Sequence, residues 1–167
     1  MQRLGPGVLL ATLLGGTPLA LAACGDGPSV TRSAESPTTT PGVTLSTERS
    51  PVGRILSTGS GQTLYDFVLD TPGHSACVSA TCVLLWPPLL VQGTPTVGQG
   101  LDPSLVGTIR RPDGSLQVTY GGHPLYTWIS DTQPGLVTGQ ATNNEGGSWF
   151  VVSPAGKQIT AAFAVTG

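Results

Sequence analysis

Apolar and polar residues alternate along this chain in short stretches, with a period of two. Residues 64–70 and residues 125–129 show the alternation best. The large apolar residues that share one face are Tyr65, Phe67 and Leu69 in the first stretch, and Tyr126 and Trp128 in the second. Because successive side chains of a strand point to opposite faces, both stretches are predicted to be half-buried β-strands.

Turn-forming residues interrupt the chain at regular intervals. Further strands are predicted between these turns at residues 116–120, 149–153 and 159–165, and a short helix at residues 79–85, ahead of Pro87. Gly and Pro are abundant, with 24 and 15 residues, and both disrupt helix interiors. The sequence therefore predicts an all-β fold, a small sandwich or barrel built from two tandem repeats of short antiparallel strands.

An internal alignment supports the two repeats. Residues 61–70 align with residues 122–131, so that Gly, Leu, Tyr, an aromatic residue and Asp recur at the same offsets. Upstream, residues 52–55 match residues 106–109, and downstream the segment from Trp86 matches the segment from Trp149. We expect one globular domain that consists of a first repeat at residues 51–105 and a second at residues 106–167.

Three short motifs in these repeats resemble those of a known family. The segments beginning at Tyr65 and Tyr126 both have the pattern Tyr-x-aromatic-x-x-Asp, residues 82–89 read Cys-Val-Leu-Leu-Trp-Pro-Pro-Leu, and residues 122–126 read Gly-His-Pro-Leu-Tyr. In these motifs the chain resembles the bacterial secreted-repeat lipoproteins with a conserved Y-x4-D pattern. No activity is assigned to that family, so the resemblance indicates that the chain is related to these proteins but does not indicate a function.

The amino-terminal residues predict export. Residues 1–23 contain Arg3, an apolar run and small residues before Cys24, which are the parts of a secretory signal peptide. Leu21-Ala22-Ala23-Cys24 resembles a bacterial lipobox, in which the cysteine is lipidated; the alternative is an ordinary signal peptide with a chance cysteine. Residues 24–50 are rich in Ser, Thr and Pro and are expected to form a disordered tether. We expect a protein anchored by lipid to the cell membrane, on its extracytoplasmic side.

The charge balance narrows the class of partner. Without Arg3 the chain has six basic and nine acidic residues, a net charge of −3, and no basic cluster. This composition excludes nucleic acid as a partner. The expected partners are the membrane lipid, reached through the acyl anchor, and a ligand or protein of the cell envelope.

Cys77 and Cys82 are an even pair once Cys24 is assigned to lipid. In an oxidising compartment such a pair predicts a disulfide. The alternative is a redox-active pair or a metal site, but the spacing is C-x4-C rather than C-x-x-C, and no further cysteine completes a zinc set.

The sequence contains no constellation that predicts a catalytic residue, a cofactor or a metal site. His74 falls in a Pro-Gly turn and His123 precedes Pro124, while the carboxylates are dispersed. A hydrolase would require a cleft that brings His123 to a serine and an acid.

The aromatic residues offer a binding hypothesis. An exposed platform for a glycan or peptide could contain Trp86, Trp128, Trp149, Tyr65, Tyr120 and Tyr126. The alternative is that these large side chains fill the core of a small domain. The candidate binding residues are accordingly Trp86, Trp149 and His123.

The aspartates of the family motif are predicted to be structural. Asp70 and Asp131 each end a strand-like segment ahead of a Pro-Gly turn, and we expect each to accept hydrogen bonds from backbone N–H groups of its own turn. The leading hypothesis for function is a non-enzymatic binding or scaffolding module of the cell envelope. The alternative is a redox- or metal-associated envelope protein that uses Cys77 and Cys82 or the two histidines.

Overall fold

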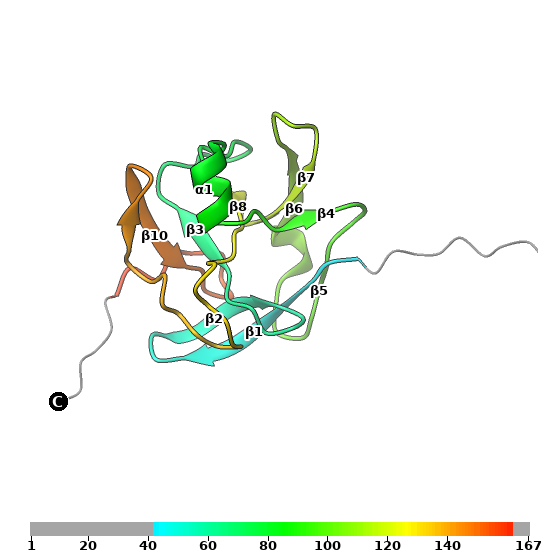
Figure 1. Ribbon diagram of the computed structural model, residues 1–167. Coiled ribbons are helices and arrows are strands. Elements are labelled where there is room, and N and C mark those ends of the chain that lie inside the picture. Colours follow the sequence, from blue (N-terminus) through cyan, green and yellow to red (C-terminus); the bar gives the residue numbers. More distant parts are fainter. Residues whose placement is uncertain (1–41, 162–167) are drawn as a thin grey trace, which may run out of the picture. The chain divides into compact units, whose positions relative to one another are not determined.

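The computed structural model describes residues 42–161 as a domain made mostly of short strands (Figure 1). The strands are β1 (Thr44–Ser50), β2 (Gly53–Thr58), β3 (Tyr65–Phe67), β4 (Leu90–Val91), β5 (Thr96–Val97), β6 (Val106–Arg110), β7 (Leu116–Tyr120), β8 (His123–Pro124), β9 (Asn143–Asn144) and β10 (Gly147–Val151). The helices are α1 (Ala80–Leu85) and a 3-10 turn at Pro103–Leu105. The predicted signal peptide and Cys24 lie outside the described residues.

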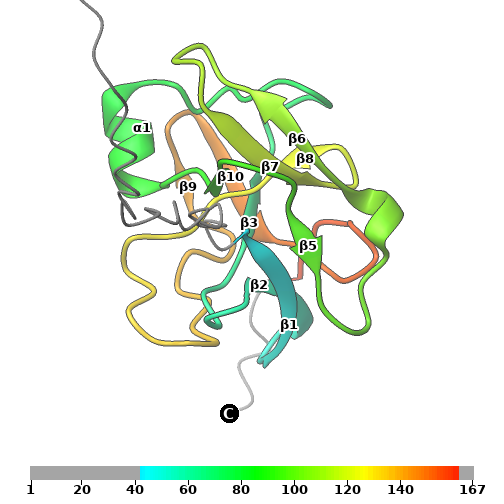
Figure 2. The ribbon, with the colours of Figure 1, turned by 90° about the vertical axis from the view of Figure 1, so that its right-hand side faces the viewer.

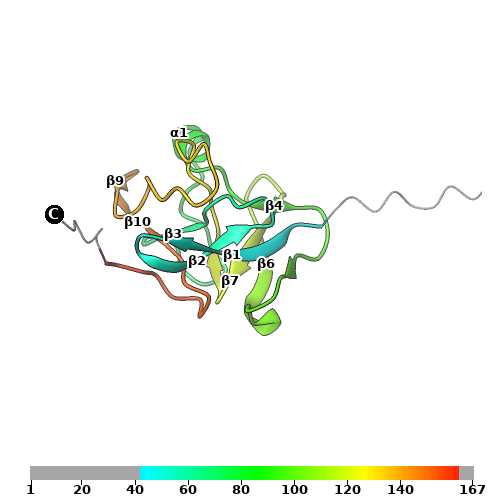
Figure 3. The same ribbon diagram turned by 90° about the horizontal axis from the view of Figure 1, so that it is seen from below.

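The strands form three small sheets, and none of them closes into a barrel. The orders are β2-β1-β5, β3-β10-β9 and β4-β7-β6, with β8 also pairing with β7. All strand pairs are antiparallel except β1 with β5, which is parallel. The β1–β2 hairpin lies at the opposite end of the domain from α1 (Figure 2) and, seen from below, between β10 and β6 (Figure 3). The all-β prediction is confirmed.

The expectation of a disordered tether through residue 50 is wrong at its carboxyl end. Thr44–Ser50 is strand β1, and it pairs along its whole length with β2. Leu45 is fully buried in the core, and this burial gives the segment a reason to be ordered that its Ser and Thr content does not reveal. The described domain therefore begins before the predicted boundary at residue 51.

Of two other local predictions, the helix at residues 79–85 is confirmed and the strand at residues 159–165 is not. The helix is present, and Ser79 caps it by accepting a hydrogen bond from the Cys82 N–H, as expected for a helix that begins after serine. The strand predicted at residues 159–165 is absent over its described part. There the amide of Gln140 donates to the carbonyls of Ile159 and Ala161, and the Ile159 N–H donates to the Val151 carbonyl.

The two halves of the domain make equivalent hydrogen bonds. The Leu64 N–H donates to the Leu56 carbonyl, and the Leu125 N–H donates to the Val118 carbonyl. By this register β2 corresponds to β7, and therefore β1 corresponds to β6. The upstream alignment of residues 52–55 with residues 106–109 is wrong, because residues 106–109 belong to β6, whose counterpart is β1.

The halves meet along a shared aromatic core. Tyr65 and Tyr126 exchange backbone hydrogen bonds of 2.9 and 3.0 Å. Beside them, Trp86 and Trp149 stack with their ring centroids 3.9 Å apart and their planes within 2°. The stack continues on both sides, with Phe67 against Trp149 at 4.1 Å and Trp128 against Trp86 at 4.2 Å. Each half thus inserts its tryptophan between aromatic rings of the other half.

The motif tyrosines and aspartates are also exchanged between the halves. The Tyr65 hydroxyl donates to Asp131 Oδ2 at 2.6 Å, and the Tyr126 hydroxyl donates to Asp70 Oδ2 at 2.7 Å. The Oδ1 atoms accept from the backbone N–H groups of Ala76 and Thr138. The aspartates are therefore acceptors, as predicted, but the N–H groups they bind lie just past the Pro-Gly turns, and the bond to the opposite repeat was not predicted.

Burial raises the pKa of both tyrosine hydroxyls well above the ordinary value. The carboxylates of Asp131 and Asp70 raise the pKa of Tyr65 and Tyr126 further, because a nearby negative charge disfavours the phenolate. Both hydroxyls therefore stay protonated and act as donors. The two bonds hold one half of the domain to the other, since each joins residues far apart in the sequence.

We expect Tyr65→Phe to lower the free energy of unfolding by about 1–3 kcal/mol, because it leaves a buried carboxylate oxygen of Asp131 without its donor. In a double-mutant cycle, Tyr65→Phe and Asp131→Ala should be strongly coupled, whereas Tyr65→Phe and Asp70→Ala should be nearly additive. Urea denaturation measures all five variants. Tyr120→Phe is the control for the loss of a buried tyrosine hydroxyl, because the Tyr120 hydroxyl makes hydrogen bonds to backbone groups and not to an aspartate side chain. Coupling of Tyr65 to Asp70 instead of Asp131 would contradict the exchange.

Candidate functional site

Of the two hypotheses for the aromatic residues, an exposed platform and a filled core, the structure supports the core. The side chains of Trp86, Trp149 and the three tyrosines are fully buried, and Trp128 is partly buried against Trp86. Stacking in the shared core accounts for their position, since a stacked tryptophan pair buries the largest apolar surfaces of the chain. A binding role for Trp86 and Trp149 at the protein surface is therefore wrong.

The predicted disulfide is confirmed. Cys77 and Cys82 are bonded, with their Cα atoms 5.5 Å apart, and both are buried in the aromatic core cluster. A buried disulfide constrains the loop ahead of α1 and does not offer a thiol to solvent. No group of three metal-ligating side chains occurs among residues 42–161. The redox or metal alternative is therefore not favoured.

The site with the most unusual chemistry lies on the other face of β3. Asp66, between Tyr65 and Phe67, is only 2% exposed, although alternation predicted it to face away from the core. The Nδ1 atom of His123, in β8, lies 3.3 Å from Asp66 Oδ2. The Nε2 amide of Gln158 donates to the same oxygen at 3.0 Å. Of the three candidate binding residues, only His123 takes part in such a site.

This pair of residues borders a pocket of about 430 Å³, lined by Asp66, Val68, His123, Gly156, Lys157 and Gln158. Asp66 Oδ1 and His123 Nδ1 are both buried, and neither has a hydrogen-bond partner in the described chain. About a third of the His123 side chain is exposed (34%), so the exposed part is the edge of the ring away from Nδ1. The Lys157 side chain is exposed at the rim of the pocket.

The electrostatics of Asp66 follow from its burial. The pKa of its carboxyl group is raised to about 6, chiefly because burial removes the group from water, and the nearby Asp70 contributes to the rise. The charge of His123 and the hydrogen bond from Gln158 act in the opposite direction and lower the pKa. Asp66 therefore changes its charge in the range in which histidine side chains also titrate.

The equivalent position in the opposite repeat shows what the fold needs at each of these two residues. The counterpart of Asp66 is Thr127, whose hydroxyl contacts the carbonyl of Pro87, and the counterpart of His123 is Gln62 at the surface. Neither is charged, yet the surrounding hydrogen bonds are equivalent in the two halves. The fold can therefore be built without an acid and an imidazole, and Asp66 and His123 are not explained by structural need. Groups that destabilise a fold locally are concentrated at functional sites.

The geometry limits the chemistry that this site can perform. No hydrogen bond joins His123 to a serine or threonine hydroxyl in the part of the chain that the structure describes. The arrangement has an acid and an imidazole but no nucleophile beside them, so the hydrolase hypothesis has no support in it. What the pocket does present is a set of groups able to bind a small polar molecule.

Residues 107–153 match a protein family described as a secreted repeat of unknown function. The match runs from β6 to just beyond β10 and includes Tyr126, Asp131 and Trp149. The resemblance inferred from the sequence is confirmed over these residues, and a secreted repeat indicates a location outside the cytoplasm. No curated protein and no solved structure matches the chain. Between residues 42 and 161 no helix is long and apolar enough to span a membrane.

The burial of Asp66 predicts a dependence of stability on pH. The folded state holds the Asp66 proton up to a pH of about 6, whereas an unfolded chain loses it near pH of about 4. The contribution of Asp66 to stability therefore falls as the pH rises through this window. We expect Asp66→Asn to be more stable than the wild type by about 1–3 kcal/mol at neutral pH, and the difference to disappear at acidic pH.

Urea denaturation at a series of pH values measures this difference. In a His123→Gln background the transition should move to higher pH, because His123 lowers the pKa of Asp66. A loss of stability in Asp66→Asn that is the same at every pH would show instead that Asp66 is a structural acceptor.

Proposed function

We propose that this chain is a lipid-anchored, non-enzymatic binding module of the cell envelope, because residues 107–153 match a family of secreted repeats. Support for the anchor comes from the sequence alone, in the signal peptide at residues 1–23 and the lipobox-like residues before Cys24. Several acyl chains on one cysteine give stable attachment, which a single chain does not. The domain would then act at the outer surface of the cytoplasmic membrane.

The single observation that carries the binding function is the pocket beside Asp66 and His123. It combines a buried carboxyl group, a partly exposed imidazole and the ammonium group of Lys157 at its rim. These groups come from both halves of the domain, Asp66 from the first and His123 and Lys157 from the second, and the counterparts Thr127 and Gln62 are uncharged. A small polar ligand with an acidic group fits this set, because it can pair with Lys157 and accept a hydrogen bond from the imidazole.

Between the two proposed roles, binding a ligand and acting as a scaffold, the preformed pocket favours binding. The pocket is held by β3, β8 and the segment 156–158, and β3 is fixed on both sides by the exchanged core. Such a site is preformed, so little ordering is needed when a ligand enters.

The binding function is tested by NMR titration of the chain from residue 24 with Cys24→Ser, labelled with ¹⁵N. The probes are acetate, inorganic phosphate and the low-molecular-mass fraction of an envelope extract. We expect at least one probe to shift the amide signals around Asp66, His123 and Gln158. His123→Gln should weaken these shifts by about tenfold in apparent affinity, and the matched variant Gln62→Ala in the other half should not. If no probe shifts these signals, or if His123→Gln binds as well as the wild type, this pocket is not the binding site.

The anchor is tested by cell fractionation. Cys24→Ser should move the protein from the membrane fraction to the soluble fraction without changing its thermal unfolding, because Cys24 precedes the domain. The double variant Cys77→Ser/Cys82→Ser is the control, since it removes the disulfide and keeps the anchor. Membrane association that persists in Cys24→Ser would rule out lipidation at this residue.

A further inference from the structure

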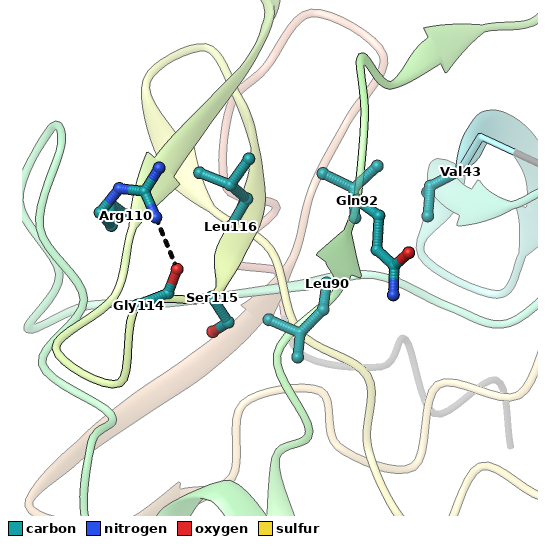
Figure 4. A pocket seen from close by; sticks show the side chains of 8 residues that line it. Val43, Leu90, Gln92, Arg110, Gly114, Ser115 and Leu116 are labelled. Atoms are coloured by element: carbon teal, nitrogen blue, oxygen red, sulfur yellow. Dashed lines mark hydrogen bonds between the residues drawn. The ribbon is translucent and has the colours of Figure 1, made fainter. Parts of the chain in front are cut away.

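A second pocket lies on a different part of the domain, beside strands β4, β6 and β7. Its volume is about 590 Å³, and its lining residues are Val43, Leu90, Val91, Gln92, Arg110, Gly114, Ser115 and Leu116. Figure 4 shows Leu90 and Leu116 in the middle of this groove, with Arg110 on one side and Gln92 and Val43 on the other. No acidic residue lines it.

The middle of the groove is apolar and accessible to solvent. The side chain of Leu90 is 44% exposed, and Leu116 and Val43 are each partly exposed beside it. A single exposed leucine is ordinary, but several apolar side chains gathered in one hollow indicate a binding surface.

The other half of the domain again serves as the comparison. Arg110 pairs with Leu116 across β6 and β7, and the equivalent pair across β1 and β2 is Arg49 with Arg54. The position of Leu116 is therefore occupied by a charged residue in the first repeat. The Leu89 carbonyl accepts a hydrogen bond from Val118, and the Val152 carbonyl accepts the equivalent bond from Leu56. Leu89 therefore corresponds to Val152, and the next residue, Leu90, corresponds to Ser153. The fold therefore accepts arginine and serine at these two positions, and of the two leucines only Leu116 packs against the core.

The charge at the edge of the groove comes from Arg110. Its Nη1 atom donates to the Gly114 carbonyl at 2.7 Å, and no carboxylate pairs with it among residues 42–161. Arg110 also borders a neighbouring pocket of about 310 Å³, which His74 and Arg111 line as well. The apolar groove therefore ends at a region of positive charge.

Asp113 and Asp70 do not cancel this charge at Arg110. The Asp113 carboxylate, on the same hairpin loop, accepts hydrogen bonds from the N–H and hydroxyl of Ser115. Asp70 lies near the buried Arg111, whose guanidinium is also bound to Ser75 and to the Cys77 carbonyl. The guanidinium of Arg110 is thus the group best placed to meet an acid at the end of the groove.

We propose that this groove binds a single-chain anionic amphiphile, with the hydrocarbon chain along Leu90 and Leu116 and the carboxylate on Arg110. This site is separate from the pocket beside Asp66 and His123, and it shares no lining residue with it. Its volume is in the range of small-molecule sites. Arginine binds a carboxylate through two parallel hydrogen bonds, so the acid group fixes the orientation of the chain in the groove.

The test is a titration of the chain from residue 24 with Cys24→Ser by dodecanoate, below its micelle-forming concentration, followed by calorimetry and ¹⁵N NMR. We expect saturable binding that shifts the amide signals of Leu90, Gln92, Arg110 and Leu116. Leu90→Ser, which introduces the residue of the other half, should weaken binding by about tenfold. Arg110→Gln should lower the affinity for dodecanoate to that for dodecanol, whereas the matched variant Arg49→Gln should leave both affinities unchanged.

Three outcomes would overturn the proposal. Signal changes spread over other exposed apolar residues, such as Leu84 and Ile129, would indicate adsorption without a site. Equal affinity of the wild type for dodecanoate and dodecanol would remove the role of Arg110. Binding to phosphatidylglycerol vesicles that depends on Leu90 and Arg110, without binding of dodecanoate, would assign the groove to the membrane surface. His123→Gln should bind dodecanoate as the wild type does, so failure of this proposal is distinct from failure at the other pocket.

Discussion

The structure depends on an exchange between its two halves. The Tyr65 hydroxyl donates a hydrogen bond to Asp131 of the second half, and the Tyr126 hydroxyl donates one to Asp70 of the first half. Between these bonds Trp86 and Trp149 stack on each other. Neither half can therefore satisfy its buried aspartate or cover its tryptophan alone. A buried carboxylate without partners is strongly destabilising, so the two halves must fold together.

This constraint explains why the motif recurs at the same offsets in both halves of the chain. A tyrosine, an aromatic residue and an aspartate at fixed offsets are what one half needs to complete the other. Positions outside the exchange are free to differ between the halves. Asp66 with His123, and Leu90 with Leu116, both occur where the other half has residues of a different kind. The comparison between halves thus separates residues that the fold requires from residues that it merely accepts.

The sequence was sufficient to predict strand β7, part of β10, the helix after Ser79, the disulfide and the repeated motif. The two stretches with the strongest alternation were predicted less well, because only Tyr65–Phe67 of residues 64–70 forms a strand, and residues 125–129 make only isolated bridges at Tyr126. The sequence did not predict β1, because that strand contains a single buried leucine among Ser, Thr and charged residues, which together have the composition of a disordered segment. The upstream alignment failed because it matched the first residues of one strand of a hairpin with those of the wrong strand of the other. It placed residues 52–55, at the start of β2, on residues 106–109 of β6, whereas the equivalent hydrogen bonds of Leu64 and Leu125 make Leu56 of β2 the counterpart of Val118 in β7.

Only one of the two central residues of the candidate site was identified from the sequence. His123 was named as a binding residue, but its partner Asp66 was not, since no local pattern shows that a residue in β3 will lie 3.3 Å from one in β8. The exchange of Tyr65 with Asp131 was hidden for the same reason, because it joins residues 66 positions apart. Periodicity and turn composition report on local structure, whereas these contacts arise from tertiary packing.

The position of Asp66 connects the exchange with the pocket. Asp66 lies between Tyr65, which is bonded to Asp131, and Phe67, which is stacked on Trp149. Both neighbours are fixed by the other half of the domain, so the backbone of β3 cannot move to bring the Asp66 carboxylate into water. Burial of that carboxylate is therefore imposed by the exchanged core, and its raised pKa is a consequence. A site that is built one residue away from a rigid core needs no induced fit to hold an unfavourable charge, and this is the physical basis for proposing a binding site beside β3.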